Sequence, residues 1–143
     1  CAESAVLRYL VTHIFLRRDE LVLLDMYAGV EHLGRATADA VDAMLVVVEP
    51  TARSLATAEQ IRDLAGDLKL ARLYLVGSKI KDPGDQEFIS ERSPGLAVLG
   101  FLPEDPRVRE ADRRGVPLYD LAPEMAQAAR AIAQQLLELA PSR

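Results

Sequence analysis

A carboxylate, a glycine, a second acid and a histidine lie close together in the segment DMYAGVEHLGR, residues 25–35, directly after the apolar run LVLL. Asp25, at the end of a strand, could bind Mg²⁺ through water or orient a water molecule for attack. Gly29 lets a ligand approach the backbone closely, and His32 could act as a general base or a metal ligand. The same residues also suit a simpler structure, in which Asp25 caps a turn, Gly29 forms a tight turn and His32 is solvated.

Four short apolar runs predict the strands that would position these residues. Continuous apolar runs, rich in β-branched side chains, are typical of strands in a parallel sheet that is covered on both faces. The second run, AMLVVVEP, stops at Pro50. The four predicted strands are residues 20–25, 43–50, 71–78 and 96–103.

Apolar residues at helical spacing lie between and beside these runs. Residues 4–18 and 123–139 show this spacing, and Pro123 occupies the first turn of the later helix, where proline is favoured. A helix in the region of residues 58–68 would have Ser54 or Thr57 as its cap. Alternation of strands and helices predicts an α/β fold, with a doubly wound, mostly parallel sheet covered by helices.

Turn residues gather in the segments KIKDPGDQ, residues 79–86, and FLPEDPRV, residues 101–108, and both are predicted as loops. Ligands bind open parallel sheets at the carboxyl ends of the strands. We therefore expect the groups that follow the four runs to lie along one edge. They are residues 25–29, 49–54, 77–79 and 103–105.

Composition limits the classes of protein that remain. The 143 residues are 50% hydrophobic, which is enough for a single domain spanning residues 1–143. A net charge of −5 argues against a general nucleic-acid surface. One cysteine excludes an internal disulfide and favours a reducing, cytoplasmic location, and no apolar run approaches the roughly 18 residues of a membrane span. Because the chain starts at Cys1 and not at methionine, we expect it to be part of a longer protein.

The extended motif at residues 21–35, LVLLDMYAGVEHLGR, resembles the switch II region of MinD/ParA-type P-loop ATPases. It is most similar to the CooC family, accessory ATPases that insert nickel into carbon monoxide dehydrogenase. Residues 41–65 and 100–118 are also similar to that family. The resemblance covers nearly the whole chain but only the carboxyl-terminal part of the family. It implies an incomplete P-loop NTPase fold, with ATP and Mg²⁺ as the cofactors of the full-length protein.

On the phosphate side, the resemblance implies that Asp25 is the catalytic residue, which holds Mg²⁺ through water or orients the attacking water. Gly29 would present its N–H to the γ-phosphate. The family's phosphate-binding loop, G-x-x-x-x-G-K-[ST], does not occur in the chain. We therefore expect the 143 residues alone neither to hydrolyse ATP nor to bind it tightly.

On the base side, the resemblance implies that Ser78 and Lys79 flank the adenine and that Pro103, Glu104 and Asp105 form a second loop whose backbone meets the base. Ser78 stands where the family usually has asparagine, so it offers a hydroxyl in place of an amide donor and acceptor. Weaker base selectivity is expected. The alternative interpretations are a loop with a solvated lysine and a simple proline-bounded turn.

The segment CAESAVLR resembles the end of the family's C-x-C segment, with Cys1 in the place of the second cysteine. Two chains with C-x-C each would bind one nickel or zinc ion at a homodimer interface, since thiolates favour these metals. Carbon monoxide dehydrogenase would be the partner protein. By composition alone, a single cysteine is an inert small hydrophobe.

Two other functions stay open. Asp25 and Lys79, each at a strand end, would also suit the phosphoacceptor site of a receiver-like signalling module. A non-catalytic interaction domain derived from a MinD/ParA ATPase is the third hypothesis. The family further implies a phosphate-loop strand between strands 20–25 and 43–50. Without it, we expect those two strands to pair directly or another chain to fill the position.

Overall fold

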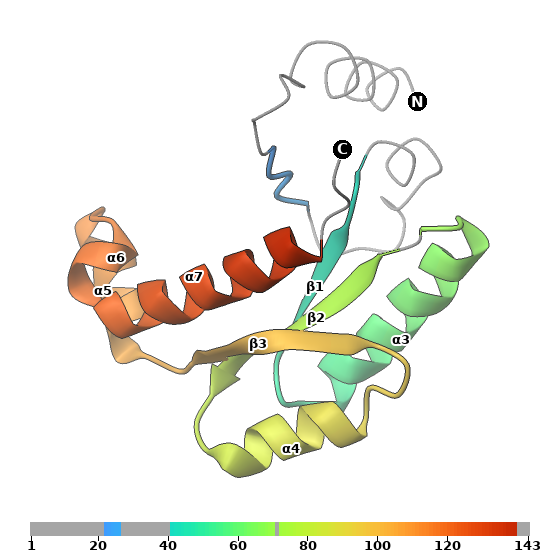
Figure 1. Ribbon diagram of the computed structural model, residues 1–143. Coiled ribbons are helices and arrows are strands. Elements are labelled where there is room, and N and C mark those ends of the chain that lie inside the picture. The colour runs from blue at the N-terminus through green and yellow to red at the C-terminus, as the bar shows by residue number, and fades with distance from the viewer. Residues whose placement is uncertain (1–21, 27–40, 71, 140–143) are drawn as a thin grey trace.

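The computed structural model describes residues 22–26, 41–70 and 72–139 (Figure 1). Strands and helices alternate along most of this part of the chain, as the sequence predicts. The elements, in order, are β1 (Met44–Val48), α3 (Ala52–Asp67), β2 (Leu73–Ile80), α4 (Pro83–Glu91), β3 (Ala97–Pro103), α5 (Pro106–Arg114), α6 (Leu118–Leu121) and α7 (Pro123–Glu138).

The strands form a three-stranded parallel sheet in the order β1-β2-β3. Helices cover both faces of it (Figure 1): α3 and α4 pack on one face, and α7 packs along β3 on the other. The predicted α/β fold, with a parallel sheet between helices, is therefore confirmed. The three strands lie within or close to the apolar runs at residues 43–50, 71–78 and 96–103, and β2 continues two residues further, to Ile80.

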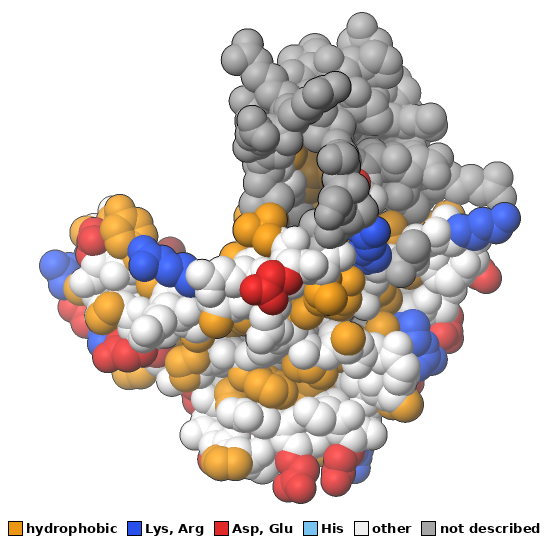
Figure 2. All heavy atoms as spheres, viewed as in Figure 1, with side chains coloured by type: hydrophobic (Ala, Val, Ile, Leu, Met, Phe, Trp, Pro, Cys, Tyr) orange, Lys and Arg blue, Asp and Glu red, His pale blue; other side chains and the backbone are white. Residues whose placement is uncertain are grey.

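Two hydrophobic clusters separate along the two faces because successive side chains of a strand point in opposite directions. Val48, Leu75 and Ile89 are almost fully buried in the cluster under α3 and α4. Val76, Leu99 and Ile132 form the cluster under α7. Figure 2 shows hydrophobic side chains between β3 and α4.

Close packing at the end of β2 depends on Gly77. A Cβ at this position would lie 2.4 Å from Cδ1 of Phe101 and 3.0 Å from Cδ1 of Ile89. The pairing register between β2 and β3 is irregular at two places, between Leu75 and Val76 and between Gly77 and Ile80. The second shift falls on residues 78–79, the segment that the sequence predicts to flank a ligand.

The cap of α3 is Thr51, and the prediction of Ser54 or Thr57 was wrong. The Thr51 hydroxyl accepts a hydrogen bond from the N–H of Ser54, and the Ser54 hydroxyl accepts one from the N–H of Glu49. The Thr57 hydroxyl donates to the carbonyl of Arg53, one turn earlier. The helix begins further back than its apolar spacing indicates, because the Thr51 hydroxyl compensates one of the free N–H groups at its start.

The two predicted loops were wrong in part, because a helix starts inside each of them. Asp82 caps α4 and Asp105 caps α5, and in both helices proline follows the cap. The dipeptide Asp-Pro is typical of turns, but it suits the start of a helix equally well. The N–H groups of the first turn have no partner within the helix, so proline, which lacks an N–H, is tolerated there. The later helix, predicted at residues 123–139, is confirmed as α7, with Met125 and Ile132 buried.

The strand predicted at residues 20–25 is not formed at the described residues 22–26. Leu23 is 82% exposed, and Asp25 is exposed as well. A strand needs a neighbouring strand for its N–H and C=O groups, and the described partner of β1 is β2. Direct pairing of this segment with β1 is therefore not observed; filling by another chain stays a prediction. Cys1, Gly29, His32 and the helix predicted at residues 4–18 lie outside the described residues.

Candidate functional site

The loops after β1, β2 and β3 lie at one edge of the sheet, because the three strands run parallel. This confirms the predicted clustering for residues 49–54, 77–79 and 103–105. Asp25 is described, but no hydrogen bond or ion pair links it to these loops among the described residues. The arrangement thus brings together the residues expected on the base side of the site and leaves open the position of the phosphate side.

An ion pair joins the ends of β1 and β2. The Nζ of Lys79 lies 2.5 Å from Oε1 of Glu49, and both side chains are about half exposed, at 59% and 46%. Exposure on this scale means that solvent screens the attraction. The pair orients the lysine side chain across the edge without fixing it firmly.

Lys79 has a left-handed backbone, with φ of 59°. A side chain disfavours this conformation by roughly 1–2 kcal/mol, so the surrounding structure must impose it. Ser78, the residue before it, is partly buried, and its hydroxyl makes no hydrogen bond to another described residue. The strained backbone and this hydroxyl both lie where the sequence predicts adenine contacts.

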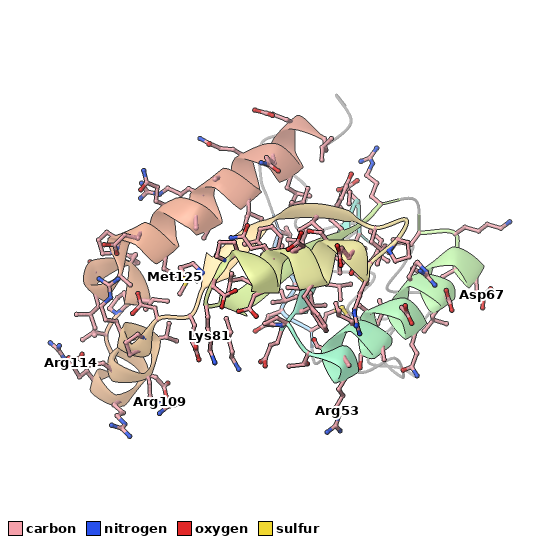
Figure 3. The ribbon with its side chains drawn as sticks, turned by 90° about the horizontal axis from the view of Figure 1, so that it is seen from below. Arg53, Asp67, Lys81, Arg109, Arg114 and Met125 are labelled. Carbon is pink, nitrogen blue, oxygen red and sulfur yellow. The ribbon has the colours of Figure 1, made fainter. Side chains whose placement is uncertain are left out.

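A second set of contacts joins the loop after β2 to the loop after β3. The N–H of Glu104 donates to the carbonyl of Ile80 at 2.8 Å, and Nζ of Lys81 lies 3.4 Å from Oε2 of Glu104. The N–H of Lys81 donates to Asp85 in α4. Figure 3 shows Lys81 between α4 and the α5–α6 helices. The two loops predicted to contact a base are therefore held to each other through backbone and side-chain contacts.

Asp105 is the most enclosed acid among the ion pairs described at this edge, with a side chain 10% exposed. Its Oδ1 accepts from the backbone N–H and the Nε of Arg107, and its Oδ2 accepts from Nε and Nη2 of the same residue at 3.0 and 2.6 Å. Arg107 also donates to the carbonyl of Leu121 at 3.1 Å and to Glu124 at 2.8 Å. One guanidinium thus connects the cap of α5 with the junction of α6 and α7.

These contacts change the acidity of all three groups. The side-chain hydrogen bonds of Arg107, followed by its backbone N–H, hold the pKa of Asp105 below its usual value. The pKa of Glu124 is lowered first by its own backbone N–H and second by Arg107. The pKa of Arg107 is raised by Asp105 and then by Glu124. All three groups are therefore charged near neutral pH.

Sequence reasoning identified Asp105 but missed Arg107 and Glu124, which bind each other across 17 positions. Asp105-Pro106 carried a usable signal for a helix start, since an acidic cap followed by proline is typical of the first turn. Glu124 carried no such signal, because only the tertiary structure brings the start of α7 to α5.

No metal site is formed by the part of the chain that the structure describes: it contains no group of three or more His, Cys, Asp or Glu side chains arranged to hold an ion. Cys1 and Gly29 lie outside the described residues. Nor does the described part contain a helix long and apolar enough to cross a membrane.

A parallel sheet with helices on both faces, and with polar loops at the carboxyl edge, defines an α/β domain of the class in which ligands are usually bound at that edge. The solved structure of the MinD cell division protein of Aquifex aeolicus is similar, with a TM-score of 0.65 and 21% identity over 80% of this chain and 51% of that one. The complex of MinC with MinD from the same organism gives a TM-score of 0.65 at 22% identity, covering 80% of this chain and 50% of that one. The fold is therefore MinD-like.

Sequence relatives are more specific. The chain is 43% identical over 138 residues to the carbon monoxide dehydrogenase accessory protein CooC of Rhodospirillum rubrum, covering 96% of this chain and 52% of the relative. It is 44% identical over 121 residues to an uncharacterized ATP-binding protein of Methanocaldococcus jannaschii, covering 82% of this chain and 47% of the relative. No protein-family model matches the chain.

The chain is a homologue of the CooC-like, MinD/ParA-type ATP-binding proteins, which confirms the resemblance found at residues 21–35. It spans about half the length of the curated relatives it matches.

Proposed function

We propose that this chain is the carboxyl-terminal half of an ATP-hydrolysing metallochaperone that serves nickel insertion into carbon monoxide dehydrogenase. The observation that carries the proposal is the 43% identity to CooC over 138 residues. The homodimer and the cytoplasmic location expected from the sequence belong to the same proposal.

The base side of the proposed ATP site lies at the described carboxyl edge. Ser78 and Lys79 flank the adenine, and the backbone of residues 103–105 contacts it from the other side. The Ser78 hydroxyl, which bonds to no other described residue, the left-handed Lys79 and the backbone link between Ile80 and Glu104 support this assignment. With one hydroxyl in place of an amide, the site discriminates among bases less strongly.

The phosphate side needs residues from both halves of the longer protein. The other half supplies the phosphate-binding loop, while Asp25 orients the attacking water or holds Mg²⁺ and Gly29 donates its N–H to the γ-phosphate. Bound Mg²⁺ supplies charge neutralisation at the phosphates. The exposed carboxylate of Asp25 is compatible with either role.

ATP hydrolysis by the longer natural protein tests the proposal. We expect slow turnover by the wild type, loss of turnover in Asp25→Ala with little loss of ATP binding, and no measurable turnover by the 143 residues alone. Glu138→Ala, at an exposed acid at the end of α7, is a matched control that should retain activity. Wild-type turnover in Asp25→Ala would remove the catalytic assignment.

Equilibrium dialysis with Ni²⁺ tests whether the longer protein binds nickel at a site shared by two chains. We expect one ion per two chains, stronger binding as the pH rises through the thiol range, and a change on adding ATP. Cys1→Ser should abolish this binding. One ion per chain, or binding unchanged by Cys1→Ser, contradicts a site shared by two chains.

Acetyl phosphate distinguishes the receiver-like alternative, because a receiver would become phosphorylated at Asp25. Under the ATPase proposal, the protein stays unlabelled. A longer protein that binds its client but neither binds nor hydrolyses ATP would instead be the non-catalytic interaction domain.

A further inference from the structure

Arg107 donates to three different residues at the carboxyl edge, and none of these contacts is needed to complete the sheet. Its guanidinium donates hydrogen bonds to both carboxylate oxygens of Asp105, to the carbonyl of Leu121 and to the carboxylate of Glu124. Asp105 is 10% exposed, whereas Arg107 is 40% and Glu124 67% exposed. The firm contact is therefore the one to the loop, and the outer contacts connect this loop to the start of α7.

The loop at residues 103–105 is consequently held at two points. On the side of β2, the N–H of Glu104 donates to the carbonyl of Ile80. On the side of α5, Asp105 is held by Arg107, and its carbonyl accepts from the N–H of Val108 at 3.1 Å. A loop fixed at both ends keeps its backbone groups in one geometry, which reduces the entropy lost when a ligand binds.

We propose that Arg107 is a positioning residue for nucleotide recognition: through Asp105 it fixes the loop at residues 103–105 so that the loop's backbone is set for the base. The inference rests on the proposed function, because it requires that a nucleotide base binds at this edge. Arg107 itself does not touch the nucleotide. Its effect on affinity acts through Asp105.

The chemistry requires arginine in particular. A planar guanidinium donates two parallel hydrogen bonds to one carboxylate and still has donors for a carbonyl and a second carboxylate. Lysine keeps the charge but lacks the two parallel N–H donors of a guanidinium. It would therefore hold Asp105 at one point and leave the loop free to rotate. Arg107→Lys should therefore behave like a partial loss, and Arg107→Gln like a full one.

Steady-state kinetics of the longer natural protein test the proposal with ATP and GTP. For Arg107→Gln we expect the KM for ATP to rise by up to about tenfold, because binding must then order the loop that Arg107 holds in place in the wild type. We expect kcat to stay unchanged and the preference for ATP over GTP to fall. Arg107→Lys should lie between this variant and the wild type.

Two further variants make the result specific. Asp105→Asn removes the charge that Arg107 grips but retains a side chain that caps α5, so the fold is preserved and KM should rise as in Arg107→Gln. Arg114→Gln removes an exposed arginine of the same helix, paired with Glu110 at 3.0 Å, and should leave KM unchanged. Figure 3 shows Arg114 at the outer end of α5.

The outcomes separate the inference from the proposed function. A longer protein that neither binds nor hydrolyses any nucleotide overturns the proposed function and this inference with it. Normal ATP turnover with an unchanged KM and unchanged base preference in both Arg107→Gln and Asp105→Asn overturns the inference alone. A fall in kcat at unchanged KM also contradicts it, because a positioning residue on the base side acts on binding.

Discussion

The ends of β2 and β3 approach the same edge but are stabilised in different ways. The end of β2 has a strained backbone at Lys79 and a half-exposed ion pair to Glu49. The end of β3 is fixed by Asp105, which caps α5 and is gripped by Arg107. One side of the proposed base site is therefore adjustable, and the other is preorganised. An adjustable side can adapt to the ligand, whereas a rigid side sets its position.

The largest expected effect concerns the packing that both ends share. Gly77→Ala puts a methyl group 2.4 Å from the Phe101 ring, so the ring or the strand ends must shift. Overpacking of this kind lowers the free energy of unfolding by about 1–3 kcal/mol. Thermal or chemical unfolding measures the loss.

Gly66→Ala is the matched control for that substitution. Gly66 lies in α3, and an alanine methyl group there would meet nothing within 4 Å, so alanine should stabilise the helix by up to about 1 kcal/mol. Equal losses at Gly77 and Gly66 would show that close packing at the strand ends is not the cause.

The next effect compares two Asp-Pro helix starts. Asp105→Ala removes a cap and the partner of Arg107, whereas Asp82→Ala removes a cap alone. We expect the melting temperature to fall clearly more in Asp105→Ala. If both variants melt alike, the guanidinium contributes nothing beyond the cap, and the contrast between the two strand ends disappears.

The pH dependence of stability tests the Asp105–Arg107 contact at the end of β3. Because the folded pKa of Asp105 lies below its usual 3.8, its contribution to stability is complete above that value and is lost as the pH falls toward the lower, folded pKa. Glu124 behaves in the same way below 4.5. Melting temperatures recorded from neutral to strongly acid pH should therefore fall less steeply in Arg107→Gln than in the wild type. Arg114→Gln should retain the wild-type slope.

The smallest effect belongs to the end of β2. Lys79→Gln breaks the pair with Glu49 and should change the free energy of unfolding by about 0.5 kcal/mol or less, because both partners are well exposed. Lys79→Gly should instead stabilise the protein by up to about 1 kcal/mol, since glycine adopts the left-handed backbone without strain. Denaturant titration distinguishes the two. A marked destabilisation by Lys79→Gln would mean that this end is as firmly fixed as the end of β3.

Local chemistry allowed much of the fold to be predicted. The apolar runs indicated β1, β2 and β3, since parallel strands buried on both faces leave no polar alternation. Pro123 and the apolar spacing after it indicated α7. The order of these elements then placed Ser78, Lys79 and residues 103–105 at one edge, because parallel strands share their carboxyl end.

Predictions failed where a local pattern has two solutions. Asp-Pro suits a turn and a helix start equally, and the structure has helices at Asp82 and Asp105. The apolar run at residues 20–25 looks like a strand, yet residues 22–26 are not one. A strand is stabilised by its neighbours, and a sequence does not state which neighbours a segment will find.

The sequence by itself determined the class of fold, the edge at which the candidate residues gather and the homology to CooC-like proteins, because periodicity and motif spacing are local properties of the chain. Only the tertiary structure decided how that edge is held together. Lys79 meets Glu49 over 30 positions, and Arg107 meets Glu124 over 17. Contacts between residues so far apart depend on how the sheet and helices pack, and no spacing along the chain encodes them.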